Sequence, residues 1–323
     1  MIIIQLAGGL GNQMFQYALY LQLKSLGKDV KIDDRTGFEH DMQRNPALAP
    51  FGITYETATA KEMECMLDAS PHMCDKIRRK LFGRNKKSYF EADKRYKPEI
   101  LAWDDIYLEG YWQTEKYFER VSEEVRKAYD VEKLLSYVRG KGAKEMQEPE
   151  ESEALFEKYL AQITLEESIS VHIRGGDYLL PENQKLFGGI CTEAYYKKAM
   201  EQMKKEHPHG RFYLFTNDKQ WTMQQIVQGG QISQGEKAGD VEIIDLGGQS
   251  DYQEFILMSK CRHHILANSS FSWWASYLNG NPDKTVYAPD RWLNGWDCTD
   301  FYRKDMRRIA ANSGETEETT IHE

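Results

Sequence analysis

The stretch IIIQLAGGLGNQMFQYALYLQLKSL, residues 2–26, decides the fold class. Its first six residues form an apolar run that is typical of a buried parallel strand. Three glycines then turn the chain into a segment, Gln13 to Leu26, whose apolar residues recur at helical spacing. DVKID at 29–33 follows as a second strand. Strand, glycine-rich turn, helix and strand in this order open a parallel α/β unit.

The same alternation continues along the chain and is clearest in the second half. Before residue 130 the sequence predicts a strand at 105–112 and a helix from Thr114 to Tyr129, whereas residues 40–100 show weak periodicity. Further strands are predicted at 169–174, 211–218, 241–247, 263–268 and 285–289, and helices at 193–206, 220–228, 251–261 and 270–280. This pattern predicts doubly wound parallel sheets, in which ligands bind beyond the carboxyl ends of the strands.

A change of composition divides the chain into two domains. Between 136 and 164 the sequence is rich in charge and poor in β-branched residues, which is typical of a linker that carries a solvated helix. We expect an N-terminal α/β domain at 1–164, including this linker, and a C-terminal α/β domain at 165–309. Residues 310–323 form an acidic tail that we expect to be disordered. A surface helix within a single domain is the alternative reading of the charged segment.

Composition and charge narrow the function classes. The 323 residues include 42 Lys and Arg against 51 Asp and Glu, a formal net charge of −9. This balance excludes a chain built to coat nucleic acid, which needs a basic surface. The five cysteines are odd in number and form no C-x-x-C, which indicates reduced thiols. No apolar stretch approaches the roughly 18–20 residues that span a bilayer, and no signal peptide is recognisable, so we expect a cytoplasmic protein.

The first candidate site is the turn GGLGNQMFQYA at 8–18. Glycines let a backbone approach a ligand closely, and the helix N-terminus that follows offers unpaired N–H groups to an anion. Asn12 and Gln13 add amides that could read a sugar or phosphate edge. We therefore predict donor contacts at Gly9, Gly11, Asn12 and Gln13. Met14 occupies the place of the third glycine of a dinucleotide fingerprint, and a purely structural turn is the alternative.

The second candidate site is VHIRGGDY at 171–178, where a predicted strand ends. His172 and Arg174 are two residues apart and therefore share one face of the strand, and Asp177 follows the turn. The Arg174 guanidinium at this place could bind a diphosphate through two parallel hydrogen bonds. The structural alternative is an ion pair between Arg174 and Asp177 that braces the loop.

Two further strand ends carry polar residues. LFTNDKQW at 214–221 contains Asn217 and Asp218, and the Asp218 carboxylate could accept hydrogen bonds from a base or ribose or cap the following helix. ILANSSFSWWASYLN at 265–279 sets polar groups at a helix N-terminus, a candidate anion site. Its candidate donor contacts are Asn268, Ser269, Ser270 and Phe271, whereas Trp273 and Trp274 are expected in the core.

Taken in order, these motifs resemble those of a known family. GGLGNQMFQYA, GYWQTEKYF, SVHIRGGDY, LFTND, FILMSKC, ILANSSFSWWASYLN and APDRW are similar to segments of the bacterial α-1,2-fucosyltransferases, glycosyltransferase family 11, over residues 1–20 and 105–295. The resemblance implies a GT-B type fold with two Rossmann-like domains, of which the C-terminal one binds GDP-β-L-fucose. It further implies metal-independent, inverting transfer of L-fucose to the 2-hydroxyl of a terminal galactoside, with no cofactor besides this co-substrate.

The resemblance also assigns roles and partners. Arg174 matches the first Arg of the family's His-x-Arg-Arg-Gly-Asp, which contacts the donor diphosphate in related fucosyltransferases, whereas Gly175 replaces the second Arg. The acceptor is a galactoside or another glycan. If that glycan is a membrane-linked intermediate, the protein works at the inner face of the membrane.

The reaction needs groups that stabilise the leaving diphosphate and accept a proton. Because no Asp-x-Asp metal motif occurs, we assign the first task to Arg174, the glycine turn and the helix N-terminus at 269–271. Asp177, His172 and Glu182 are candidate bases, among which the sequence does not choose.

Two other function classes stay open at this point. A nicotinamide oxidoreductase could use Asp33 or Asp34 as its ribose-binding acid, but it lacks the complete glycine fingerprint. A non-catalytic sugar-binding module fits the abundant aromatic residues.

Overall fold

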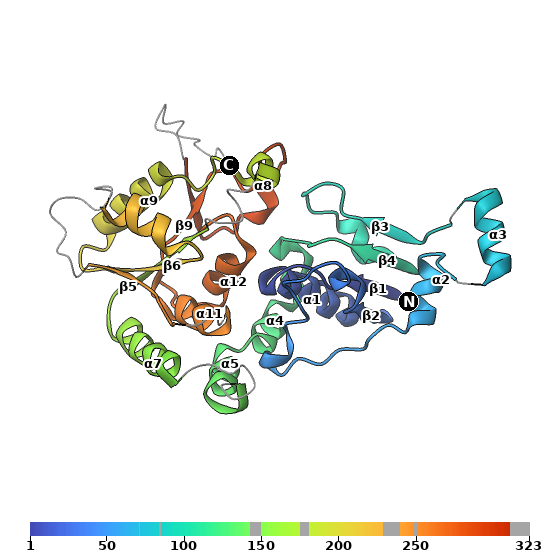
Figure 1. Ribbon diagram of the computed structural model, residues 1–323, viewed down its shortest axis with the longest axis horizontal. Coiled ribbons are helices and arrows are strands. Elements are labelled where there is room, and N and C mark those ends of the chain that lie inside the picture. Colours follow the sequence, from blue (N-terminus) through green and yellow to red (C-terminus); the bar gives the residue numbers. More distant parts are fainter. Residues whose placement is uncertain are drawn as a thin grey trace.

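The chain contains two parallel β-sheets (Figure 1). A computed structural model describes residues 1–70, 72–83, 85–142, 150–174, 181–228, 240–247 and 251–310. The first sheet has the order β2-β1-β4-β3 and comprises β1 (Ile2–Gln5), β2 (Val30–Asp33), β3 (Ser88–Phe90) and β4 (Ile106–Glu109). The second has the order β10-β9-β8-β5-β6-β7 and comprises β5 (Ser168–Ile173), β6 (Arg211–Thr216), β7 (Val241–Ile243), β8 (His263–Ile265), β9 (Val286–Pro289) and β10 (Met306–Ile309).

Helices cover both faces of the second sheet. Along β6, Phe212 and Leu214 pack with Tyr195 of α9 (Glu193–Glu206) in one core cluster. Tyr213 and Phe215 belong to the other cluster, which contains residues of α11 (Asp251–Lys260) and α12 (Ser270–Leu278). The long helices are α1 (Leu10–Ser25), α7 (Glu150–Leu165), α9 (Glu193–Glu206), α11 (Asp251–Lys260) and α12 (Ser270–Leu278). The shorter ones are α2 (Ala60–Met66), α3 (Met73–Phe82), α4 (Ser122–Ala128), α5 (Val131–Tyr137), α8 (Pro181–Phe187) and α10 (Lys219–Trp221). Two parallel sheets of this doubly wound kind confirm the α/β, GT-B type expectation.

The helix predicted from Thr114 to Tyr129 is wrong in its first half. Thr114 accepts a hydrogen bond from the backbone of Lys116 and starts a short 3₁₀ turn instead, and α4 begins only at Ser122. Tyr117 and Phe118 are both buried in the main core, so tertiary packing of these two rings bends the segment. Likewise, the segment predicted as a helix at 220–228 is α10 followed by π-helical residues 222–228. Strands β3 and β10 are additions that the sequence analysis did not predict.

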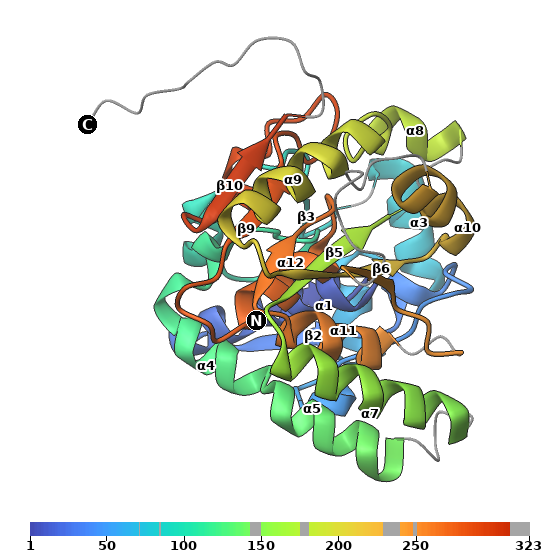
Figure 2. The same cartoon turned by 90° about the vertical axis from the view of Figure 1, so that its left-hand side faces the viewer.

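The charged segment before β5 contains a packed helix. The α7 side chains Phe156 and Ile163 are fully buried, and α7 contacts α11, beside which it runs in Figure 2. This differs from the solvated helix that the charge content predicts, because the apolar positions of α7 fall on one face. The domain limits at 164 and 309 stay predictions, and the tail beyond Ala310 lies outside the described residues.

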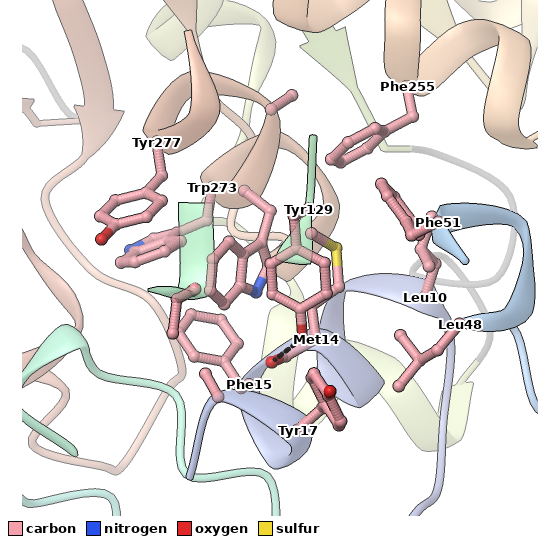
Figure 3. Packing of buried hydrophobic residues seen from close by; sticks show 14 of the residues in the cluster. Leu10, Met14, Phe15, Tyr17, Leu48, Phe51, Tyr129, Phe255, Trp273 and Tyr277 are labelled. Atoms are coloured by element: carbon pink, nitrogen blue, oxygen red, sulfur yellow. Dashed lines mark hydrogen bonds between the residues drawn. The ribbon is translucent and has the colours of Figure 1, made fainter. Parts of the chain in front are cut away.

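An aromatic cluster joins the two sheets through α1 and α12 (Figure 3). The ring of Phe15 lies 4.6 Å from that of Trp273 and 4.9 Å from that of Trp274, centroid to centroid. Tyr129 packs on Trp274 and donates a 2.8 Å hydrogen bond to the Met14 carbonyl. Trp273 and Trp274 are 1% and 0% exposed, which confirms the core position expected for them.

Gly11 marks the closest approach of α1 to α12. A Cβ atom placed on Gly11 lies 2.5 Å from the backbone carbon of Ser270 and 2.7 Å from the Phe271 nitrogen. Both distances are shorter than van der Waals contact, and both involve backbone atoms that move only if the helices separate. The first turns of the two helices therefore touch because position 11 has no side chain.

We expect Gly11→Ala to lower the free energy of unfolding by about 1–3 kcal/mol, the usual cost of overpacking, as measured by urea denaturation. Gly280→Ala is the matched control, since it follows the other end of α12 and a Cβ there meets no atom within 4 Å. The control should stay within about 0.5 kcal/mol of wild type. Equal stability of Gly11→Ala and wild type would contradict a tight contact between the helices.

Candidate functional site

The topology of the second sheet singles out one place for a ligand. From β5 the chain runs outward through β6 and β7, then returns to β8 on the other side of β5 and runs outward through β9 and β10. In open parallel sheets, ligands bind at such a switch point, beyond the carboxyl ends of the two strands that flank it. Arg174 directly follows β5, and Asn268, Ser269 and Ser270 follow β8. The structure thus brings the second and fourth sequence motifs to the same edge of the sheet.

The first motif reaches the same place through the contact between α1 and α12. Asn12 Oδ1 accepts hydrogen bonds from Ser270 Oγ at 2.7 Å and from Gln113 Nε2 at 2.6 Å. Among the predicted donor contacts, five are partly exposed at or beside these helix ends: Gly9, Asn12, Ser269, Ser270 and Phe271. Gly9 forms the N-cap of α1 without a side-chain cap, and Ser269 Oγ caps α12 by accepting from the Phe271 N–H. Two helix N-termini that meet in this way favour an anion, because their free N–H groups and dipoles point toward it.

His172 and Arg174 line the β5 side of the site. The His172 ring lies 5.9 Å from that of Phe271, and it is 7% exposed. Burial and the neighbouring Arg174 charge lower the pKa of His172 to about 3, so the imidazole is neutral at physiological pH. No described residue hydrogen-bonds its buried Nδ1. A buried, neutral imidazole of this kind is suited to accept one hydrogen bond from a ligand or to donate one to it. Its low pKa makes the imidazole a weak base.

Glu254 is a candidate that the sequence analysis missed. It lies in the first turn of α11, partly buried, and its pKa is raised to about 7 by burial and by the charge of Asp251. The positive charges of Lys219 and Arg174 oppose this rise, which places the carboxyl within electrostatic range of Arg174. A carboxyl group with a pKa near 7 beside a strand-end guanidinium is suited to take up a proton during a reaction. The quoted motif FILMSKC begins one residue later and therefore leaves Glu254 out. The available signal was an acidic residue directly before an apolar run.

Three predicted contacts serve the fold instead. Gln13 is fully buried, and its amide donates to the Gly8 and Asn45 carbonyls and accepts from the Ala47 N–H, so it holds residues 45–47 on α1. Asn268 is 2% exposed and donates to the Trp292 carbonyl. Asp218 accepts from the Trp221 N–H and caps α10, the alternative noted from the sequence.

The remaining predicted residues lie away from these contacts or outside the described chain. Gly11 is buried in the contact between α1 and α12, and Asn217 is exposed just beyond β6. Asp177 and Gly175 fall outside the described residues. Glu182 lies in α8, but its side chain falls outside them as well.

Within the described ranges, one group of three metal-ligating side chains lies close together: Glu167, His207 and His263. Glu167 precedes β5 and His263 opens β8, so this group is at the amino ends of the strands, opposite Arg174. His263 Nδ1 accepts a 3.0 Å hydrogen bond from the Thr285 N–H, which puts the proton of the neutral ring on Nε2. Since Nε2 is the atom that faces Glu167, this ring offers no lone pair to a metal there.

Solved structures resemble the chain only loosely. The E. coli ADP-heptose lps heptosyltransferase II aligns over 96% of this chain and 90% of its own at 12% identity, with a TM-score of 0.42. POFUT1 in complex with GDP-fucose aligns over 90% and 97% at 9% identity, with a TM-score of 0.39. No described helix has both the length and the apolar character that a membrane span requires.

Sequence relatives match the chain at higher identity than these solved structures do. An alpha-1,2-colitosyltransferase of Escherichia coli is 26% identical over 93% of this chain and 95% of its own length, and the O-antigen biosynthesis glycosyltransferase WbnK of the same species is 26% identical over 90% and 94%. The galactoside alpha-(1,2)-fucosyltransferase 1 of Saimiri boliviensis boliviensis is 31% identical over 37% of this chain and 30% of its own length. The model of glycosyl transferase family 11 matches residues 150–305, the part that contributes Arg174, Glu254 and the α12 N-terminus. These matches identify the chain as a glycosyltransferase that is similar to glycosyl transferase family 11 over residues 150–305.

Proposed function

We propose that this protein is an inverting, metal-independent α-1,2-fucosyltransferase that moves L-fucose from GDP-β-L-fucose to the 2-hydroxyl of a terminal galactoside. The names of the relatives support the α-1,2 linkage and a sugar of the fucose or colitose type. One observation carries the proposal: the N-termini of α1 and α12 meet at the switch point of a parallel sheet, and the strand that neighbours β8 there is β5, which Arg174 follows. That arrangement suits the diphosphate of a nucleotide-sugar donor.

The leaving diphosphate gains negative charge as the glycosidic bond to the donor breaks. Free N–H groups in the first turns of α1 and α12 and the Arg174 guanidinium are positioned to stabilise that charge without rearrangement. The partly exposed Ser270 hydroxyl lies on the same surface, held by its hydrogen bond to Asn12. In this assignment the protein groups take the part that a metal ion plays in other glycosyl transfers.

The acceptor hydroxyl loses a proton as it attacks the anomeric carbon. With a pKa of about 7, Glu254 has a much higher proton affinity than His172, whose pKa is about 3. We therefore assign the proton to Glu254 and a hydrogen-bonding role to His172. Inversion follows because the acceptor attacks from the face opposite the diphosphate.

The direct test is release of GDP from GDP-fucose in the presence of lactose, followed by linkage analysis of the product. The expected product carries fucose on the 2-hydroxyl of the galactose unit. GDP-colitose is tested in parallel, and a clear preference for it would replace fucose as the donor sugar. Binding of either donor with no transfer would indicate a non-catalytic sugar-binding module.

We expect Arg174→Ala to lower kcat/KM by about 10²–10³, the usual effect of removing one preorganised charge-stabilising donor. Arg262→Ala is the matched control, because Arg262 is exposed at the opposite end of the same sheet and should leave the rate unchanged. Thermal unfolding of both variants checks that the fold is intact. Retention of more than about a tenth of the wild-type rate would exclude Arg174 as the group that stabilises the leaving diphosphate.

Glu254→Gln should have opposite effects on turnover and on stability. Wild-type kcat/KM should rise with pH and level off above about pH 7, where the carboxylate is charged, and the variant should lose about 10²–10⁴ in rate. Because the raised pKa means that the folded protein holds this proton more tightly, wild-type stability falls between pH 4.5 and 7. At pH 8 the variant should therefore be more stable by about 1–2 kcal/mol, a gain that vanishes below pH 4.5.

Glu201→Gln, an exposed change on α9, is the matched control for this experiment and should alter neither quantity. A Glu254→Gln variant that keeps wild-type turnover and its pH profile would remove Glu254 from the mechanism. A loss of turnover without the gain in stability would contradict the raised pKa.

An excess of EDTA should leave the transfer rate unchanged. The described metal-ligating group, Glu167 with two histidines, lies at the amino ends of the strands and is unsuited to hold a cation on the donor diphosphate. The measurement compares initial rates with chelator alone and with chelator followed by excess Mg²⁺ or Mn²⁺. Loss of activity with EDTA that either cation restores would overturn metal independence.

A further inference from the structure

Helix α3 carries an exposed apolar stripe at the edge of the N-terminal sheet. Its sequence, MCDKIRRKLF, repeats apolar residues at Met73, Ile77 and Leu81, four residues apart and therefore on one face. These side chains are 72%, 53% and 69% exposed, and Phe82 at the end of the helix is 82% exposed. Figure 1 shows α3 at the right-hand end of the molecule, far from α12. Contiguous exposed apolar side chains on one helix face mark an interaction surface.

The opposite face of α3 is fixed to the chain that precedes it. Arg78 pairs with Asp68, Arg79 donates a 2.6 Å hydrogen bond to the Ser70 carbonyl, and Asp75 accepts a 2.6 Å hydrogen bond from Ser70 Oγ. These contacts set the rotation of the helix about its own axis. The apolar stripe consequently points away from the domain rather than into it.

Positive charge lies beside the stripe. Lys76 and Lys80 are both exposed, and at four residues apart they follow the stripe along one side. Lys86, just after the helix, is exposed as well, whereas the neighbouring Lys87 pairs with Asp105. This concentration of lysines stands out in a chain whose formal net charge is −9. An apolar stripe bordered by lysines fits a surface that is negatively charged outside and apolar within.

A second copy of the chain fits this surface less well. In a symmetric dimer the same patch meets itself, so Lys76 and Lys80 of one copy would approach those of the other. Like charges at such an interface cost free energy and oppose association. The lysines therefore favour a partner of opposite charge.

We propose that α3 is a membrane-docking helix, which lies in the headgroup region of an anionic phospholipid bilayer with Met73, Ile77 and Leu81 inserted and Lys76 and Lys80 on the phosphates. The helix is too short to span a bilayer and lies on it. One short apolar stripe with a few lysines gives weak, reversible binding. Docking of this kind holds the N-terminal sheet at the membrane surface without altering the site at the switch point.

The test is co-sedimentation of the full chain with vesicles of phosphatidylethanolamine and phosphatidylglycerol, and with vesicles of phosphatidylcholine alone. Wild type should bind the anionic vesicles at low salt, bind less as salt rises, and stay in solution with phosphatidylcholine. The double variants Ile77→Ser with Leu81→Ser, and Lys76→Glu with Lys80→Glu, should each reduce the vesicle partition coefficient by about tenfold or more. Both should keep wild-type circular dichroism and wild-type transfer to a soluble acceptor.

Matched controls replace residues of the same kind elsewhere. Leu165→Ser changes an 83% exposed leucine at the end of α7, and Lys127→Glu with Lys133→Glu moves the net charge by the same amount on other helices. Neither control should reduce vesicle binding. Wild type that remains in solution with anionic vesicles at low salt, or α3 variants that bind as wild type does, would overturn the proposal. So would a dimer in sedimentation velocity that the α3 variants dissociate, which would assign the stripe to a second copy. The vesicle assay uses no sugar donor, so its outcome is independent of the proposed reaction.

Discussion

The backbone contact between the first turns of α1 and α12 is the constraint on which the rest of the structure depends. These helices follow β1 and β8, so the contact ties the carboxyl end of one sheet to that of the other. Gly11 permits the approach, and the ring of Phe15 fills the space behind it against Trp273 and Trp274. A bulkier residue at position 11 would separate the helices and open the aromatic cluster at the same time. A substitution that loosens the packing between α1 and α12 would therefore also change the positions of their N-termini in the candidate site.

The same contact explains why the site suits an anion. Two helix dipoles that meet at their N-termini repel each other unless negative charge lies between them. The hydrogen bonds of Asn12 to Ser270 and Gln113 hold the ends together without supplying that charge. In the proposed reaction a bound diphosphate would supply that charge, and its attraction to the two aligned helices would contribute to binding and to transition-state stabilisation. The aromatic cluster keeps the helices in place when the ligand has left.

Local patterns predicted the framework well, and long-range contacts account for what they missed. Helix α9 matches its predicted limits, 193–206, because its apolar spacing and the Thr192 cap are local features. The helix predicted from Thr114 failed because burial of Tyr117 and Phe118 decides the path there, which no local signal reveals. Gln13 and Asn268 were predicted as donor contacts, and their hydrogen bonds to the Asn45 and Trp292 carbonyls were not predictable because these partners are distant in sequence. Glu254 was missed for a similar reason, since its raised pKa arises first from burial, which depends on packing against distant parts of the chain, and then from the charge of Asp251.

The positive charge of Arg174 affects the protonation of two neighbouring groups, and it lowers the pKa of both. Its charge opposes the rise in the pKa of Glu254, so it helps that carboxyl to ionise near neutral pH, and it lowers the pKa of His172, so it keeps the imidazole uncharged. In the proposed reaction, a diphosphate bound to Arg174 would partly cancel this positive charge, so Arg174 would stabilise the Glu254 carboxylate less while the donor is intact. A second source of positive charge is then needed, and the N-termini of α1 and α12 supply it. Because they offset part of the phosphate charge, Arg174 continues to stabilise the Glu254 carboxylate. The proposed reaction would thus need both the Arg174 guanidinium and the contact between α1 and α12, and with Gly at position 175 in place of a second Arg it would depend more strongly on the helices.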